Sequence, residues 1–265
     1  MSKVDMHSNY QLTSDDVRAF IEKESIRRQS NKVLHGHPSP LHWKPLDLPI
    51  ENILTDRLNY SSTTSQEVNL YVGTPFCIKT KPARCGFCLF PSEDYEGNKG
   101  VEAYLGYLKR EFAMYKPFYA GDKLSSIYFG GGTPNLYRPK HYGLVLDYVD
   151  ELYGGIPSDI EITLEGIPQL FNEEKIKAIS EAGFNRVSMG VQQLNDELIK
   201  YSGRRQTRKQ VFDAIENCHK YDLANSIDLI YGWPEQTMDD MLNDLKTAVD
   251  AVSYTHLTLP TTPYV

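Results

Sequence analysis

The sequence has no long hydrophobic segment. Nowhere in its 265 residues does a stretch approach the run of about 18 apolar residues that a membrane-spanning helix needs. The N-terminal stretch MSKVDMHSNYQLTSDD has no apolar core either, so it does not match a secretory signal. These absences argue against the membrane-spanning and secreted classes. We therefore expect a cytoplasmic protein with no membrane partner.

Positive charge is also scarce. The chain has 28 lysines and arginines against 35 aspartates and glutamates, which gives a net charge of −7. Non-specific nucleic-acid binding needs a basic surface that neutralises phosphates, so we expect no nucleic-acid partner. Apolar residues make up 40% and charged residues 24% of the chain, as in ordinary globular domains.

Cysteine is the third scarce residue, with four in the chain. In a reducing compartment, cysteines bind metals or catalyse more often than they form disulfides. Cys77, Cys85 and Cys88 share the stretch YVGTPFCIKTKPARCGFCLF. Three thiolates are one ligand short of a closed tetrahedral zinc site, and an open position suits catalysis. The loop predicts a [4Fe–4S] cluster whose fourth iron binds S-adenosylmethionine. The alternatives are a zinc site completed by Cys218, which lies in a predicted helix, or three unrelated thiols.

Short apolar strands alternate with helices from Val68 onwards. The predicted strands are 68–75, 124–129, 159–165, 186–192 and 225–232. The predicted helices are 100–115, 141–152, 172–183, 208–221 and 237–251. Pro117 is expected to stop the first helix and Gly154 to end the second. Asn172 caps the third and Thr237 the last, which has an apolar face that includes Leu242 and Val249. This alternation predicts an α/β fold with a parallel sheet covered by helices. Periodicity does not separate an open sheet from a barrel.

The flanking segments break this pattern. Residues 1–67 are predicted to be an N-terminal arm and linker, in which His35, His37 and His42 are surface residues of a proline-rich stretch. The threonine-rich run VSYTHLTLPTT resembles the translation of a sequencing adapter, although a genuine loop is the alternative. We therefore expect residues 252–265 to be a non-native tail. The core, 68–251, is then truncated after its fifth βα unit.

Unusual residues stand at the predicted C-terminal ends of the strands, where α/β folds place their chemistry. Gly130–Gly132 lets the backbone approach a ligand, although most glycine-rich turns are only turns. Glu165 suits an ammonium group or ribose hydroxyls, with a solvated strand end as the alternative. Asp228 is a charge inside an apolar strand and needs a partner, and Arg204 suits a carboxylate. These positions predict a site at one rim of the sheet.

A family resemblance rests on the strings YVGTPFC, CGFC, IYFGGGTP, ITLE, AGFNRVSMGVQ and SIDLIYGWPEQT, in this order. From Tyr71 to Ala251 the chain resembles the oxygen-independent coproporphyrinogen III oxidases and their relatives in the radical SAM superfamily. The resemblance implies a partial (β/α)6 barrel with a [4Fe–4S] cluster on Cys77, Cys85 and Cys88. It implies that S-adenosylmethionine is bound by Tyr71, Phe87, Gly131, Gly132, Thr133, Glu165, Gln192, Arg204 and Asp228.

The resemblance also implies an enzyme. The reduced cluster of such an enzyme splits S-adenosylmethionine into methionine and a 5′-deoxyadenosyl radical, which takes a hydrogen atom from a small-molecule substrate. Oxidative decarboxylation of porphyrinogen propionates is the expected reaction. The alternatives are a methyltransferase or haem-degrading relative, or a non-catalytic iron–sulfur or haem-handling carrier. We expect a monomer that receives electrons from a flavodoxin or ferredoxin.

Three features depart from the family. Seven residues separate Cys77 from Cys85, where the family has three. Gly73 occupies the position of a histidine in the oxidases, and Leu89–Phe90 lacks their additional cysteine. The longer loop can still close, because loop-closure entropy grows slowly with length. Its basic residues Lys79, Lys81 and Arg84 are expected to be solvated rather than to hold an acidic substrate. The departures concern the decarboxylation and not the cluster.

Overall fold

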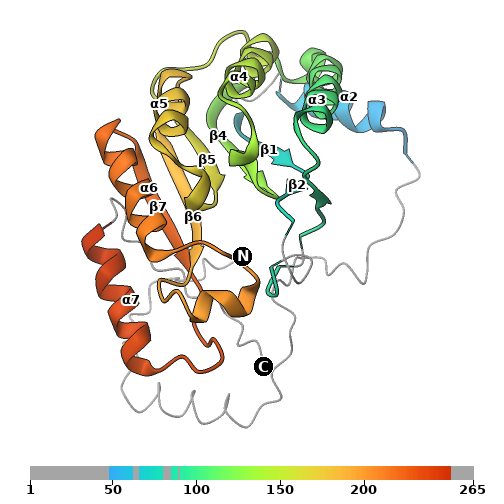
Figure 1. Cartoon of the computed structure of the whole chain (residues 1–265). Coiled ribbons are helices and arrows are strands. Elements are labelled where there is room, and N and C mark those ends of the chain that lie inside the picture. The colour runs from blue at the N-terminus through green and yellow to red at the C-terminus, as the bar shows by residue number, and fades with distance from the viewer. Residues whose placement is uncertain (1–47, 62–65, 80–84, 89, 252–265) are drawn as a thin grey trace, which may run out of the picture. The chain divides into compact units, whose positions relative to one another are not determined.

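The computed structural model describes residues 48–61, 66–79, 85–88 and 90–251 (Figure 1). All of them belong to one of the two compact units into which the chain divides, residues 46–258. The predicted histidine cluster and the predicted non-native tail lie outside the described residues. The boundaries of the predicted arm and core therefore stay a prediction.

A five-stranded parallel sheet forms the centre of this unit. Its strands, in spatial order, are β1 (Glu67–Thr74), β4 (Lys123–Gly131), β5 (Glu161–Gly166), β6 (Arg186–Gln192) and β7 (Ala224–Leu229). Every neighbouring pair is parallel, so all the strands end at the same rim. The predicted α/β fold with a parallel sheet is confirmed. The first and last residues of each observed strand lie within a few residues of the predicted ones.

A helix follows each strand of the sheet. The helices are α3 (Asn98–Tyr119), α4 (Pro139–Tyr153), α5 (Glu173–Glu181), α6 (Arg208–Lys220) and α7 (Met238–Ala251). Short 3-10 helices lie in three of the connections: η2 (Pro134–Leu136), η3 (Pro168–Leu170) and η4 (Leu198–Ser202). In Figure 1, α3, α4, α5 and α6 lie along one side of the sheet.

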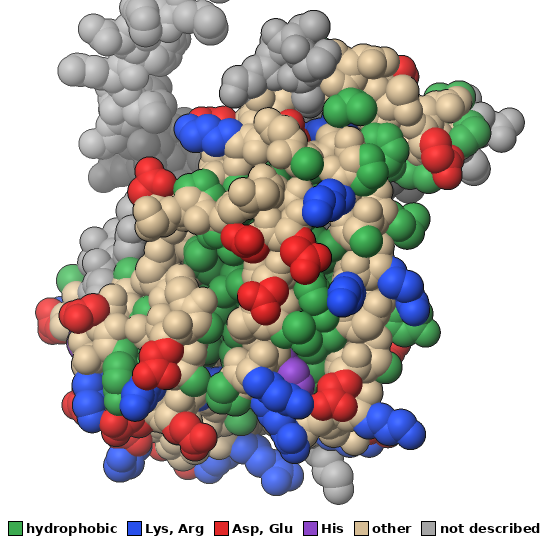
Figure 2. Space-filling model, turned by 90° about the horizontal axis from the view of Figure 1, so that it is seen from above, with side chains coloured by type: hydrophobic (Ala, Val, Ile, Leu, Met, Phe, Trp, Pro, Cys, Tyr) green, Lys and Arg blue, Asp and Glu red, His purple; other side chains and the backbone are tan. Residues whose placement is uncertain are grey.

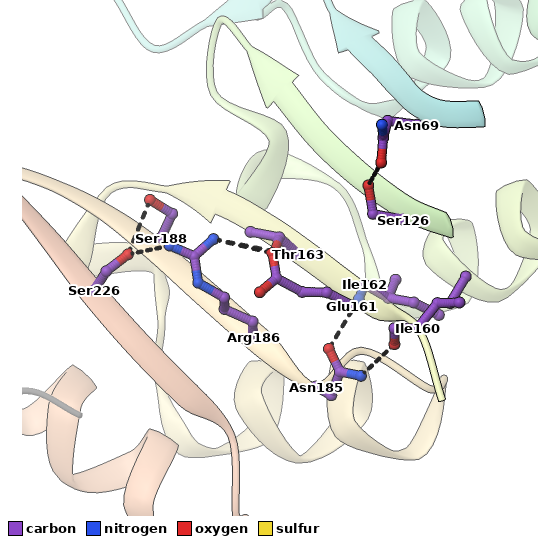
Figure 3. Close-up of polar contacts among 10 residues, drawn as sticks. All are labelled: Asn69, Ser126, Ile160, Glu161, Ile162, Thr163, Asn185, Arg186, Ser188 and Ser226. Atoms are coloured by element: carbon purple, nitrogen blue, oxygen red, sulfur yellow. Dashed lines mark hydrogen bonds and ion pairs between the residues drawn. The ribbon is translucent and has the colours of Figure 1, made fainter. Parts of the chain in front are cut away.

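The two faces of the sheet differ because side chains alternate along each strand. One face contributes apolar residues such as Val72, Ile127 and Leu164 to the core beneath the helices. The other face is polar (Figure 3). There Ser126 donates a hydrogen bond to Asn69 at 2.6 Å between oxygens. On the same face Arg186 donates to the hydroxyls of Ser226 at 2.8 Å and Thr163 at 3.2 Å, which links three adjacent strands.

Helix ends follow the capping residues that the sequence offers. The Asn172 side chain accepts a hydrogen bond from the Lys175 amide, as predicted. Gly154 ends α4 in the left-handed conformation, also as predicted. Thr237 and Asp240 exchange hydrogen bonds at the start of α7, which is the predicted capping arrangement.

One local prediction is wrong, and one helix was not predicted. Helix α3 passes through Pro117 and ends at Tyr119. The unpredicted helix α2 (Ile50–Ser61) packs there: Arg57 donates to the Phe118 carbonyl at 2.8 Å and stacks on Tyr119 with its guanidinium carbon 3.6 Å from the ring centroid. These contacts stabilise the last turn of α3 in spite of the proline.

The predicted apolar face of α7 is only partly covered. Leu242 and Val249 are 45% and 53% exposed, while the buried residue of this helix is Asp244. Elsewhere on the molecular surface, acidic and basic side chains are interspersed with hydrophobic ones over the face drawn in Figure 2. Among the described residues, no helix is both long and apolar enough to cross a bilayer.

Candidate functional site

The cysteine loop begins at Cys77, which ends the short strand β2 (Phe76–Cys77). This strand pairs in parallel with β3 (Glu93–Asp94), and the Tyr95 amide donates to the Cys77 carbonyl at 2.7 Å. Together β2 and β3 hold the two ends of the loop side by side. Residues 80–84, which belong to the seven-residue spacing, lie outside the described residues.

Cys85 and Cys88 lie in a tight turn in which the Cys88 amide donates to the Cys85 carbonyl at 2.9 Å. The turn is held by a different part of the chain. The Gly86 amide donates to the carbonyl of Ser202, the last residue of η4, at 3.1 Å. The cysteine pair is thus anchored to the segment after β6, whereas Cys77 is anchored beside β1.

The three cysteines line a single cavity together with Gly132, Thr133, Ile167, Gln169, Arg204 and Arg205. All three are free and half-buried. Among the described residues, no three His, Cys, Asp or Glu side chains lie close enough to hold a single metal ion. A four-iron cluster makes a different demand, because each thiolate binds a different iron of the cluster. Three thiols around a shared cavity fit that group.

Cys218 lies apart from this cavity, on helix α6. It is fully buried, and burial raises the pKa of its thiol to about 12. A thiol in such an apolar place stays protonated and makes a poor metal ligand. The donor arrangement therefore does not support the alternative of a zinc site completed by Cys218.

The glycine turn packs its backbone directly against the cysteine loop. The Gly132 amide donates to the Thr74 carbonyl and the Thr133 amide to the Phe76 carbonyl, both at 2.7 Å. A Cβ atom on Gly132 would collide with that Phe76 carbonyl and lie 3.1 Å from the Cys77 sulfur. Glycine is therefore required at position 132, and the turn forms one wall of the site.

Gly130 leaves room for a group of polar side chains. A Cβ atom at this position would lie 2.5 Å from the Tyr71 hydroxyl and 2.8 Å from Oε2 of Glu165. Tyr71 stacks on Tyr128 with ring centroids 5.7 Å apart and an 11° angle between the planes. The Gly131 amide and the Tyr128 side chain lower the pKa of Glu165, against the larger effect of burial. The rim of the sheet thus brings together residues of β1, β4 and β5.

The electrostatics of this rim favour a positively charged ligand. Burial raises the pKa of Glu165, and the negative charge of Asp228 raises it further. Partial desolvation also raises the pKa of Asp228, which lies exposed on the edge strand β7, and the charges of Arg186 and Arg204 oppose this rise. Burial and then the charge of Glu165 raise the pKa of Tyr128 to about 12. A cation would stabilise both carboxylates in their ionised form.

Gln192 and Arg204 complete the site. The pairing of β6 with β7 is irregular between Gly190 and Gln192, and Gln192 has a φ of +68°. A bulge of this kind re-aims a side chain. Arg204 donates through Nη1 to the Gly190 carbonyl and through Nε to the Cys85 sulfur at 3.3 Å. Its guanidinium carbon lies 5.4 Å from the centroid of the Phe87 ring.

The structure thus places the predicted site residues along one rim of the sheet. The ring of Phe87 packs edge to face on the ring of Trp233, with centroids 6.0 Å apart. Sequence reasoning missed Tyr128, Trp233 and the role of Gly130. Tyr128 and Gly130 stand two apart on one strand, a spacing that places them on the same face of the sheet. Lys79 is exposed, pairs with Glu96 at 3.3 Å and lines the cavity of the three cysteines, while Lys81 and Arg84 lie outside the described residues. That these basic residues are solvated stays a prediction.

Comparisons with known proteins agree with this geometry. Residues 71–248 match the family model of the radical SAM superfamily, whose members bind a [4Fe–4S] cluster and S-adenosylmethionine, the two predicted cofactors. The chain is 34% identical to a heme chaperone HemW of Synechocystis, over 68% of this chain and 44% of that protein. It is 31% identical to anaerobic coproporphyrinogen III oxidase 1 of Cereibacter sphaeroides, over 72% and 43%.

A solved structure shows the same fold. The coproporphyrinogen III oxidase HemN of Escherichia coli superimposes with a TM-score of 0.71 and 27% identity, over 81% of this chain and 48% of that chain. This likeness confirms the predicted α/β radical SAM fold. The chain spans about half the length of the curated relatives that it matches.

Proposed function

Because this chain belongs to the radical SAM superfamily, we propose that it is an enzyme that cleaves S-adenosylmethionine reductively. Cys77, Cys85 and Cys88 would hold a [4Fe–4S] cluster, and the adjoining rim would hold S-adenosylmethionine. The observation that best supports the proposal is the single cavity lined by all three cysteines and by Gly132 and Arg204. That cavity opens where parallel strands end, which is the usual place for chemistry in α/β folds.

The bound cofactors would supply one electron and a sulfonium bond whose cleavage gives methionine and a carbon radical. The protein's own residues hold and orient the reactants. The carboxylates of Glu165 and Asp228 suit the cationic and hydroxyl groups of S-adenosylmethionine, and the guanidinium of Arg204 suits its carboxylate. Phe87, next to Cys88, packs edge to face on Trp233 with ring centroids 6.0 Å apart, which adds apolar surface beside the cysteine turn.

Anaerobic reconstitution with iron and sulfide tests this proposal. We expect about four irons and four sulfides per chain, and formation of 5′-deoxyadenosine when S-adenosylmethionine and dithionite are added. Cys85→Ala should lose both results, whereas Cys218→Ala, which removes the buried cysteine outside the cavity, should keep them. Wild-type protein that holds the cluster but forms no 5′-deoxyadenosine would contradict the enzymatic proposal.

We further propose that the substrate is a tetrapyrrole, because both groups of relatives are named for tetrapyrroles. The first candidate reaction is oxidative decarboxylation of porphyrinogen propionates. It predicts release of carbon dioxide and a vinyl product from coproporphyrinogen. Accumulation of S-adenosylhomocysteine would instead identify a methyltransferase.

A second candidate is haem handling without turnover. It is supported by the heme chaperones among the relatives, one of which is 34% identical to this chain. Titration with haem separates the two candidates: saturable Soret changes without a decarboxylated product favour the carrier, and product without haem binding favours the oxidase.

A further inference from the structure

The side chain of Arg204 joins the cysteine loop to strand β6. Its Nε donates to the Cys85 sulfur at 3.3 Å, and its Nη1 donates to the Gly190 carbonyl and to Oε1 of Gln206 at 3.4 Å. The guanidinium also lies over the Phe87 ring at 5.4 Å. Three hydrogen bonds and one ring contact therefore fix the orientation of this half-buried side chain, and the bond to the Cys85 sulfur is one of them.

The backbone beneath Arg204 is fixed by the same segment that holds the cysteine turn. The Arg204 amide donates to the Ser202 hydroxyl at 3.3 Å, while the Ser202 carbonyl accepts from the Gly86 amide at 3.1 Å. Ser202 is buried, and its hydroxyl donates to the Ile199 carbonyl at 2.6 Å. Arg204 and Cys85 are thus positioned by one short stretch of chain, so their contact does not depend on a flexible surface side chain.

We propose that Arg204 is a positioning residue that donates a hydrogen bond to the thiolate of Cys85 in the cluster-loaded protein and raises the reduction potential of the cluster. The inference rests on the proposed function. Reduction adds negative charge to the cluster and its thiolates, and a hydrogen-bond donor at a ligating sulfur stabilises that charge. A neighbouring arginine charge acts in the same direction.

The three nitrogen atoms of the Arg204 guanidinium do not share the same partners. Among the described residues, Nε and Nη1 are engaged by Cys85, Gly190 and Gln206, and no hydrogen bond is recorded from Nη2. Nη2 can therefore bind the carboxylate of S-adenosylmethionine while Nε stays on the sulfur. Arg205 is the matched control. It lines the same cavity and is exposed, and among the described residues it makes no hydrogen bond to a cysteine.

Pulsed EPR on the reduced cluster tests the hydrogen bond directly. Protein labelled with 15N-arginine and reconstituted anaerobically should show a 15N coupling to the cluster. We expect Arg205→Lys to keep that coupling and Arg204→Lys to lose it. In redox titrations followed by EPR, Arg204→Lys should have a lower midpoint potential than wild type and Arg205→Lys an unchanged one.

The outcomes separate this inference from the proposal beneath it. Wild-type protein that assembles no four-iron cluster overturns both. A wild-type cluster without 15N coupling, or with a coupling that disappears in Arg205→Lys, overturns only the inference. An unaltered potential and coupling in Arg204→Lys do the same. If Arg204→Lys assembles no cluster, the labelled wild type and labelled Arg205→Lys still decide the question.

Discussion

Glu165 on β5 and Asp228 on β7 interact across the intervening strand β6. Burial raises the pKa of the Glu165 carboxyl, and the negative charge of Asp228 raises it further. A carboxylate whose ionisation is opposed by burial and by a second carboxylate is costly to the empty fold and suited to a cationic ligand. This relationship gives the rim a measurable pH dependence.

Glu165→Gln should stabilise the cofactor-free protein at neutral pH. A carboxyl whose folded-state pKa is raised destabilises the fold once it ionises. The cost is absent below the ordinary pKa of 4.5, grows as the pH rises from there to the folded-state pKa, and is complete above it. We therefore expect a higher melting temperature for Glu165→Gln at pH 7 and an unchanged one near pH 4, with weaker binding of S-adenosylmethionine. An equal gain at both pH values would contradict this account. Glu216→Gln, at an exposed glutamate of α6, is the control.

Gly130→Ala should damage ligand binding more than it damages the fold. The new methyl carbon would lie 2.5 Å from the Tyr71 hydroxyl and 2.8 Å from Oε2 of Glu165, so both side chains must move. We expect at least a tenfold loss of affinity for S-adenosylmethionine, about 1.4 kcal/mol, measured by equilibrium binding to the cluster-loaded protein.

Gly106→Ala supplies the matched control. Gly106 lies within α3, and a Cβ atom there would have no neighbour within 4 Å. Replacing a helical glycine by alanine should add about 0.5 to 1 kcal/mol of stability and leave binding unaltered. Equal affinities for the two variants would mean that the space at Gly130 is not used by the site.

The sequence predicts elements whose signals are local. The capping oxygens of Asn172 and Thr237 lie within three residues of the amides that they bind, so the starts of α5 and α7 follow from short motifs. Apolar runs predict the strands because this signal also lies within the residues of each strand. The special residues at strand ends could be assigned to one rim because all parallel strands end there.

Features that depend on distant contacts could not be predicted. Helix α2 depends on Arg57, which reaches Phe118 and Tyr119 far along the chain. The contact between Arg204 and Cys85 joins residues 119 positions apart. The left-handed conformation of Gln192 also has no local signal, because a non-glycine residue with positive φ is set by the strands around it.

Gln192→Gly should make the protein more stable and less able to bind its cofactor. Gln192 has a φ of +68°, a conformation that glycine adopts without strain. Relief of that strain should raise the free energy of unfolding by up to about 1 kcal/mol in urea titrations. Loss of the amide side chain should weaken S-adenosylmethionine binding. A variant that is both less stable and fully competent to bind would refute the assignment of strain to function.

Asp244 is a buried carboxylic acid on helix α7, which is otherwise partly exposed. It is 3% exposed, and burial raises the pKa of its carboxyl to about 6, although the charge of Arg208 opposes this rise. The ordinary value is 3.8, so ionisation costs stability progressively between pH 4 and pH 6 and the full cost is present above pH 6.

Asp244→Asn removes that cost and keeps an acceptor for the Leu194 amide. We expect it to stabilise the fold by about 2 kcal/mol at pH 7.5 and by much less at pH 4, as measured by urea unfolding. Asp250→Asn, on an exposed turn of the same helix, should leave the free energy of unfolding within about 0.5 kcal/mol of wild type at both pH values. If Asp244→Asn destabilises the protein at pH 7.5, the ionised carboxylate and its attraction to Arg208 stabilise α7, and the burial cost is smaller than that attraction.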